Sequence, residues 1–127
     1  IYGSTTLAAI EESCAANADV LGVELKFLQS NHEGELVAWI QEARHEADAI
    51  IINPAGYSFH SVPILDALKM FPGPIIETHI SNIHARDEQH RHSILSAVST
   101  GVICGLGAYG YLVAMQSAVN LLGALRN

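Results

Sequence analysis

The sequence predicts an α/β fold in which helices cover both faces of an open, parallel β-sheet, giving three layers. Three observations favour it. Helical and strand periods alternate along the chain, residues 50–52 are three consecutive isoleucines, and no internal repeat or linker interrupts the alternation. A strand that apolar is buried on both sides, as in a parallel sheet. The 127 residues, half of them apolar, suffice for one compact core, so we expect a single domain over residues 1–127.

The first half of the chain alternates between helix and strand. Leu7, Ile10 and Cys14 recur at helical spacing and predict a helix over residues 5–22. A short strand is expected at residues 23–29, followed by a helix over residues 33–47 with Asn31 as its cap. The isoleucine strand comes next.

The second half repeats this pattern. Ser61 followed by Pro63 predicts a helix start, because a capping hydroxyl precedes a first turn fixed by a proline ring. The Pro-Gly-Pro sequence at residues 72–74 ends that helix. Strands are expected at residues 74–80 and 102–104, the second one leading through a glycine-rich turn into a closing helix.

Chains with this order of elements begin with a strand, whereas this one begins with Ile1-Tyr2-Gly3 and passes directly into helix. It also lacks an initiator Met. We therefore expect that an N-terminal strand and loop belong to the protein and are absent from this sequence.

Charge and composition exclude several classes of function. The net charge of −7, with only six Lys and Arg, disfavours a nucleic-acid partner, since affinity for phosphate depends on those residues. No apolar run approaches the roughly 20 residues that a membrane span needs, and no signal peptide opens the chain. Cys14 and Cys104 lie far apart and are expected as buried thiols. These features predict a cytoplasmic protein without a membrane partner.

Ligands of open α/β sheets bind at the carboxyl ends of the strands, and three segments of this sequence fall there. Residues 53–61 follow the isoleucine strand, and residues 78–93 follow the next strand. Tyr2 precedes the first helix and joins them if a strand comes before it. We expect these segments to line one cleft.

Two alternative sites are weaker. Gly105, Gly107 and Gly110 form a GxGxxG pattern, but no second βαβ unit and no acidic residue about 20 positions on follows it, so a tight turn into a closely packed helix is favoured over dinucleotide binding. Four of the seven histidines lie in residues 77–93 without the i, i+4 or CxxC spacing that braces zinc ligands. His90-x-His92 could bind a metal weakly, and we expect no metal centre.

Glu77 and His79 are the strongest candidate pair, because residues two apart in a strand project from the same face. A carboxylate beside an imidazole fixes its tautomer and makes it a competent general acid near neutral pH. The competing interpretation is that His79 is a buried structural histidine, with a neighbour that meets its need for a hydrogen bond.

Further groups at the same edge complete a possible site. The backbone N–H groups of Ile80 and Ser81 are placed to bind a carboxylate, and Asn53 offers a fixed donor and acceptor. Tyr2 adds a phenol, which serves as a base only if a cation lowers its pKa from about 10. Proton removal beside a carbonyl with protonation of a leaving hydroxyl is a dehydration.

Several segments of this sequence resemble type II 3-dehydroquinate dehydratases. They are YGSTTL, QSNHEGELVAWIQEAR, IIINPAGY, PIIETHISNIHARDE, RHS and TGVICGLGAYGYLVA, and they cover essentially the whole chain in unbroken order. The resemblance implies a flavodoxin-like fold, no cofactor, a small-molecule substrate, and a homododecamer built as a tetramer of trimers. It also implies conversion of 3-dehydroquinate to 3-dehydroshikimate by anti elimination through an enolate.

The resemblance assigns roles by position. Tyr2 matches the base, His79 the acid that protonates the departing hydroxyl, and Glu77 the carboxylate that orients the histidine. The positions that match substrate-binding groups are Asn53, Ile80, Ser81 and Asp66, the last reaching a neighbouring subunit's site. An arginine that activates the tyrosine belongs to the family's preceding loop, which this sequence does not contain.

Three departures from the family pattern affect substrate contacts. Phe59 stands where the family has a histidine, His90 stands at the usual substrate-binding arginine, and Leu65 replaces an arginine often found before Asp66. His60 and Arg91, adjacent in sequence to two of these positions, are candidate substitutes. A buried hydroxyl without its partner costs about 1–3 kcal/mol, enough to weaken binding or favour another substrate.

Three alternatives to the dehydroquinate reaction follow from these observations. A related lyase of the same fold could act on another hydroxylated cyclic acid, a non-catalytic protein could keep only the scaffold, and a flavodoxin-like protein could bind FMN. Tyr2, Asn53, Glu77, His79 and Ser81 occur together, which disfavours a bare scaffold, since a scaffold requires none of them.

Overall fold

Three parallel strands form one sheet in the computed structural model, which describes residues 5–126, with the backbone alone at 125 and 126. The strands are β1 (Ile50–Ile52), β2 (Ile75–His79) and β3 (Gly101–Cys104). Their order in the sheet is β1-β2-β3, and Ile52 pairs with Glu77 while His79 pairs with Cys104. The predicted open parallel sheet is confirmed for this part of the chain.

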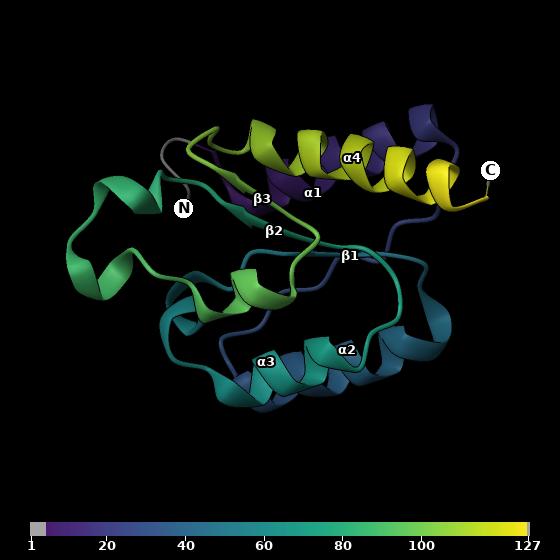
Figure 1. Ribbon diagram of the computed structural model, residues 1–127. Coiled ribbons are helices and arrows are strands. Elements are labelled where there is room, and N and C mark those ends of the chain that lie inside the picture. The colour runs from purple at the N-terminus through teal and green to yellow at the C-terminus, as the bar shows by residue number, and fades with distance from the viewer. Residues whose placement is uncertain (1–4, 127) are drawn as a thin grey trace.

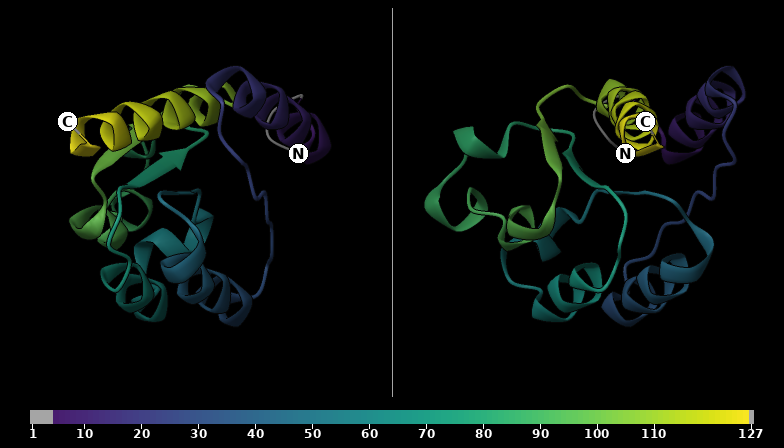
Figure 2. Two further views of the ribbon diagram at one scale, coloured as in Figure 1. Left: turned by 90° about the vertical axis from the view of Figure 1, so that its right-hand side faces the viewer. Right: turned by 45° about the vertical axis from the view of Figure 1, so that its right-hand side comes forward.

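Helices cover both faces of the sheet. α1 (Leu7–Leu21) and α4 (Tyr109–Arg126) lie side by side on one face, and α2 (Glu33–Glu46) and α3 (Val62–Lys69) lie on the other (Figures 1 and 2). The result is a three-layer α/β/α arrangement, as expected from the sequence.

The isoleucine run of β1 connects the two halves of the core. Ile51 packs toward Met115 and the other apolar residues shared by α1 and α4, whereas Ile50 and Ile52 pack toward the cluster of α2 and α3 that includes Ile64. Alternate side chains of a strand point to opposite faces. Both faces are covered here, and for this reason three consecutive isoleucines are stable in one strand.

A capping hydroxyl begins α3 at Ser61, as the sequence predicted. The Ser61 hydroxyl accepts a hydrogen bond from the Ile64 N–H at 3.2 Å, with Pro63 in the first turn. Thr6 caps α1 in the same way through the Ala9 N–H, at 3.1 Å. The helix predicted at residues 33–47 is present as α2, but its predicted Asn31 cap was wrong. His32 holds the N-cap position without a side-chain bond, and the Asn31 carbonyl instead accepts from the Tyr57 hydroxyl.

The strand expected at residues 23–29 is also a wrong prediction. The segment is irregular and belongs to no ladder of the sheet. Val23, Leu25 and Phe27 alternate with polar residues, as in a half-buried strand, but a strand forms only through pairing with a neighbour. Val23 and Leu25 stay 37% and 38% exposed, so this apolar row lacks the cover that its pattern suggests.

A long connection between β2 and β3 contains the histidine-rich segment. It is built from three 3-10 turns, η2 (Ile83–Ala85), η3 (Glu88–His90) and η4 (Ile94–Val98), while η1 (Ala55–Phe59) follows β1. η2 and η3 extend away from the sheet, and η4 returns to pack beneath it (Figure 1).

Within residues 5–126, the helices are too short or too polar to cross a membrane.

Candidate active site

Glu77 and His79 form a buried pair at the carboxyl end of β2. Their side chains share one face of the strand, and the His79 Nε2 lies 2.5 Å from the Glu77 Oε2. Glu77 is fully buried and His79 is 4% exposed. The predicted proximity of these two side chains is confirmed, and the period of the strand explains it.

Serine hydroxyls from η4 hold the other oxygen of the Glu77 carboxylate. The Ser96 Oγ donates to the Glu77 Oε1 at 2.7 Å, and Ser99 approaches the same oxygen at 3.4 Å. Burial alone raises the pKa of Glu77, but the hydrogen bonds from His79, Ser93 and Ser96 outweigh it and hold the pKa below its usual value. Glu77 is therefore a stable anion beside the imidazole.

The glycine-rich turn between β3 and α4 lies against this site. Gly105 and Gly107 have φ angles of 84° and 61°, in the region that disfavours other residues, and their N–H groups donate to the carbonyls of His79 and Ile80 at 3.2 and 3.0 Å. The predicted tight turn is thus confirmed. It fixes the backbone immediately after the imidazole.

Asn53 follows β1 at the same edge of the sheet. Its Nδ2 donates to the Tyr111 hydroxyl of α4 at 2.8 Å, and its Oδ1 accepts from the Ala55 N–H at 3.2 Å. Ala55 has a φ of 49°, a left-handed conformation that costs energy for a residue with a Cβ. The sequence identified Asn53 from its place after a strand, but it gave no signal for its Tyr111 partner.

Ile80 and Ser81 follow β2 directly, as expected. Within residues 5–126, neither of their N–H groups donates a hydrogen bond, so both remain available to a bound carboxylate. The Arg86 guanidinium donates to the Ser81 hydroxyl and brings a positive charge to this position. Sequence reasoning missed Arg86, because its five-residue return through η2 has no periodic pattern.

The side chains of Phe59 and His90, from η1 and η3, contact each other. Their ring centroids lie 5.6 Å apart at an interplanar angle of 84°, an edge-to-face contact between η1 and η3. The His90 Nδ1 lies 2.8 Å from the Asp87 Oδ1, and this bond lowers the pKa of Asp87. Two of the three positions that depart from the family pattern, Phe59 and His90, are therefore in direct contact.

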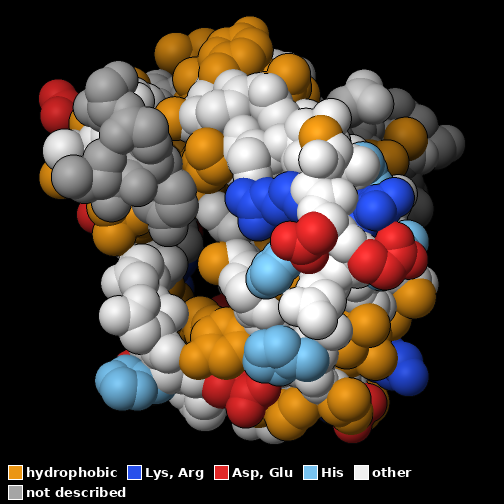
Figure 3. Space-filling model, turned by 90° about the vertical axis from the view of Figure 1, so that its left-hand side faces the viewer, with side chains coloured by type: hydrophobic (Ala, Val, Ile, Leu, Met, Phe, Trp, Pro, Cys, Tyr) orange, Lys and Arg blue, Asp and Glu red, His pale blue; other side chains and the backbone are white. Residues whose placement is uncertain are grey.

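The two candidate substitutes are partly engaged elsewhere. His60 is exposed and packs edge-on against the Tyr57 ring, with centroids 6.0 Å apart. The Arg91 Nη2 pairs with Glu88 at 3.0 Å, while its buried Nε has no partner among the described residues. Basic, histidine and acidic side chains gather on the face of the molecule drawn in Figure 3, which is the left-hand side of Figure 1.

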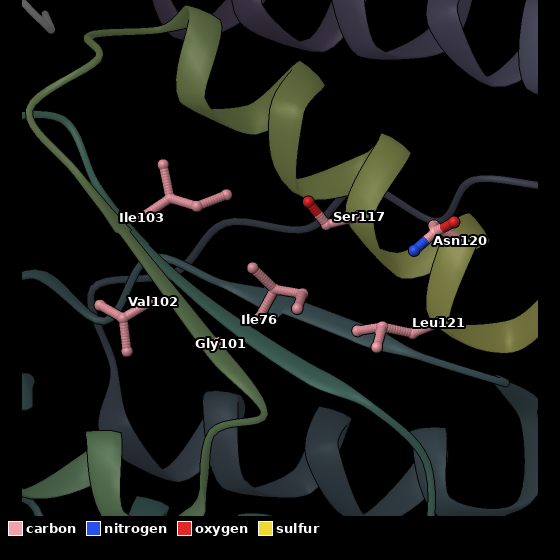
Figure 4. A pocket seen from close by; sticks show the side chains of 7 residues that line it. All are labelled: Ile76, Gly101, Val102, Ile103, Ser117, Asn120 and Leu121. Atoms are coloured by element: carbon pink, nitrogen blue, oxygen red, sulfur yellow. The ribbon is translucent and has the colours of Figure 1, made fainter. Parts of the chain in front are cut away.

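Two surface pockets lie away from the Glu77–His79 pair. One, of about 310 Å³, lies between α4 and the edge strand β3, and its polar side chains are Ser117 and Asn120 (Figure 4). The other, of about 550 Å³, lies between α2 and α3 and includes Asp66. Asp66 is exposed there, so the structure does not bring it to the other predicted residues within this chain.

Two expectations concern groups that the described residues do not supply. Tyr2, the predicted base, lies outside residues 5–126. No cluster of three or more His, Cys, Asp or Glu side chains that could hold a metal ion occurs among the described residues.

The two cysteines differ in burial. Cys104 is half-buried rather than buried, and Cys14 is buried as expected.

The imidazole of His79 contacts a carboxylate at the carboxyl end of a parallel strand, beside backbone N–H groups that donate to no described residue. This arrangement defines an α/β protein with a site suited to proton transfer. The family model described as dehydroquinase class II matches residues 1–119. The chain belongs to the class II dehydroquinase family.

Individual relatives agree with this assignment. The chain is 48% identical over 124 residues to a 3-dehydroquinate dehydratase of Caulobacter sp. (strain K31), covering 98% of this chain and 84% of that protein. It is 51% identical over 121 residues to 3-dehydroquinate dehydratase 2 of Agrobacterium fabrum, covering 95% and 82%. The crystal structure of type II dehydroquinase from Propionibacterium acnes superimposes with a TM-score of 0.90 at 38% identity, covering 94% of this chain and 83% of that chain.

Proposed function

We propose that this protein is a 3-dehydroquinate dehydratase, a hydro-lyase that converts 3-dehydroquinate to 3-dehydroshikimate and water. The family membership supports the reaction, and the contact between Glu77 and His79 supports the acid that it needs. The reaction belongs to the shikimate pathway. Family membership is also our reason for placing the protein in the cytoplasm.

The elimination needs one base and one acid on opposite sides of the ring. Tyr2 takes a proton from the carbon beside the carbonyl, and the C–H electrons move to the carbonyl oxygen as an enolate. The enolate then collapses, the C–O bond of the leaving hydroxyl breaks, and His79 donates the proton that makes the departing group water. Glu77 stabilises the imidazolium before this transfer.

The remaining groups orient the substrate in this proposal. The N–H groups of Ile80 and Ser81, which donate to no residue within 5–126, bind the substrate carboxylate with support from the Arg86 charge. The Asn53 amide binds a ring oxygen. By resemblance, four trimers assemble into a dodecamer and Asp66 reaches a neighbouring subunit's site. The exposed position of Asp66 is compatible with that role.

The observation that carries the proposal is the 2.5 Å contact within the buried Glu77–His79 pair. We expect the purified full chain to convert 3-dehydroquinate, followed by the rise of enone absorbance. His79→Ala should lower kcat by about 10²- to 10⁴-fold, the usual contribution of a general acid. Circular dichroism should show an unchanged fold.

An exposed histidine supplies the control. His45 lies on α2, outside the candidate site, so His45→Ala should keep the wild-type turnover. Equal turnover in wild type and His79→Ala would remove His79 from the mechanism.

A second candidate function is a lyase of this fold that acts on a related hydroxylated cyclic acid. It is favoured by the edge-to-face contact of Phe59 and His90, which occupies the two positions that the resemblance assigns to a substrate-binding histidine and arginine. A phenyl ring donates no hydrogen bond to a ring hydroxyl. Wild-type protein that eliminates water from such an acid and leaves 3-dehydroquinate unchanged would favour this candidate.

A further inference from the structure

We propose that Ser96 is a positioning residue for proton transfer at His79, acting through the Glu77 carboxylate. Its hydroxyl fixes the rotation of the carboxylate, and the carboxylate in turn fixes which imidazole nitrogen faces the substrate. The inference deepens the proposed dehydratase function and rests on it for its kinetic part.

The two oxygens of Glu77 have separate partners. The Oε2 contacts the His79 Nε2 at 2.5 Å, and the Oε1 accepts from the Ser96 Oγ at 2.7 Å. A carboxylate with only one oxygen bound can rotate about its terminal torsion, which is broad for glutamate. Binding both oxygens removes that freedom, so the imidazole plane is held at one orientation.

Ser99 makes a much weaker contribution to this arrangement. Its Oγ approaches the Glu77 Oε1 at 3.4 Å, but it lies 2.9 Å from the Leu95 carbonyl, which is the better acceptor for its single proton. Ser96 has no competing acceptor among the described residues. Ser93 also stabilises the Glu77 anion, but its hydroxyl in addition caps η4 by accepting from the Leu95 N–H at 3.3 Å. The 2.7 Å bond to the Oε1 therefore assigns the positioning role to Ser96.

The arrangement also selects the reacting nitrogen. Because Glu77 is an anion, the His79 Nε2 carries the proton that faces it. The His79 Nδ1 makes no hydrogen bond to residues 5–126, so it is the nitrogen that can donate to a leaving hydroxyl. A rotated carboxylate would lose this distinction between the two nitrogens.

Few other ionisable groups face the carboxylate. His79 lies on the same strand, and the half-buried Cys104 thiol lies on β3, where burial and then the Glu77 charge raise the pKa of the thiol. η4 contributes hydroxyls and no charge, and β1 contributes isoleucine. Ser96 is thus a principal neutral donor to this anion.

The test combines kinetics with NMR of the histidine rings in the full chain. Ser96→Ala should lower kcat for 3-dehydroquinate by about 10- to 100-fold, the effect of one hydrogen bond to a charged group, with KM unchanged. Ser96→Thr, which restores the hydroxyl, should recover most of the turnover. The Nε2 proton of His79 should exchange slowly in wild type and rapidly in Ser96→Ala.

Ser117→Ala is the matched control. The Ser117 hydroxyl is also half-buried and donates to the Val113 carbonyl within α4 at 2.8 Å, away from Glu77. This variant should keep both the turnover and the slow Nε2 proton of wild type.

The outcomes separate this inference from the proposed function. If wild type dehydrates 3-dehydroquinate and Ser96→Ala behaves as Ser117→Ala in both measurements, the positioning role is overturned and the function stands. A failure of Ser96→Thr to restore turnover overturns it as well. If wild type leaves the substrate unchanged while Ser96→Ala still releases the Nε2 proton, the function fails and the positioning role stands.

Discussion

Two regions of the molecule pair histidines with carboxylates, and they differ in burial. Glu77 and His79 lie on β2, where Ser96 of η4 contacts the carboxylate, and they are 0% and 4% exposed. In the η3 loop, the side chains of Glu88 and His92 contact each other at 3.1 Å while 76% and 69% exposed. The same chemical pair is thus present once inside the fold and again at its surface.

Burial decides what each pair contributes. Water screens an exposed ion pair, whose contribution to stability is typically about 0–1 kcal/mol. Inside the protein, an anion must find its hydrogen bonds within the fold, and the removal of one partner leaves a desolvated group unpaired. The buried pair should therefore tolerate little change, and the η3 loop should tolerate much.

The largest effect should come from removing the buried charge. Glu77→Gln keeps the size of the side chain but removes the anion that contacts the His79 Nε2 at 2.5 Å. We expect kcat for 3-dehydroquinate to fall by about 100-fold or more, within the range of general acid catalysis. Steady-state kinetics by enone absorbance would measure it.

Glu11→Gln makes the same chemical change on the exposed face of α1 and should leave kcat unaltered. A Glu77→Gln enzyme with turnover similar to Glu11→Gln would contradict the comparison, because the buried pair would then matter no more than a surface group.

Local patterns in the sequence predicted the parts of the fold that depend on local rules. The isoleucine run, the Ser61 cap and the glycine turn are set by neighbours in the chain, and all three are confirmed. Residues 23–29 have the alternation of a strand, yet no ladder of the sheet includes them. Pairing depends on segments far away in the chain, which a local pattern does not contain.

The same difference between local and distant contacts applies to the candidate site. Glu77 and His79 are two residues apart in one strand, so the period of the strand predicted their contact. Ser96 reaches Glu77 from 19 residues away, through the 3-10 turns that return to the sheet. No periodicity predicts such a return, and for this reason the serine was missed.

A smaller effect of the buried pair should appear in the stability of the protein at acid pH. The pKa of Glu77 is lowered in the folded state, so below about pH 4.5 the unfolded chain binds the proton more readily. The free energy of unfolding should therefore fall as the pH drops from about 4.5 through the lowered pKa, by at most about 1.4 kcal/mol per pH unit for this one group. Urea unfolding between pH 6 and pH 3 would measure it.

Glu77→Gln has no carboxyl to titrate at this position, so its free energy of unfolding should decline less steeply over the same pH range. Glu11→Gln, which keeps the Glu77 carboxyl, is the matched control and should keep the part of the wild-type decline that depends on Glu77. Identical slopes for all three proteins would mean that the hydrogen bonds of Glu77 do not favour its anion in the folded state.

The smallest effect should come from the exposed pairs. Glu88 contacts Arg91 at 3.0 Å and His92 at 3.1 Å, so Glu88→Gln disrupts two ion pairs at once. Both lie at the surface, where each contributes little, and we expect the melting temperature to change by less than about 2 °C. The difference should vanish near 1 M salt, because screening then acts within about 3 Å. A larger change that persists in high salt would show that the η3 loop is held by packing around these groups, and the contrast with the buried pair would then rest on contacts other than charge.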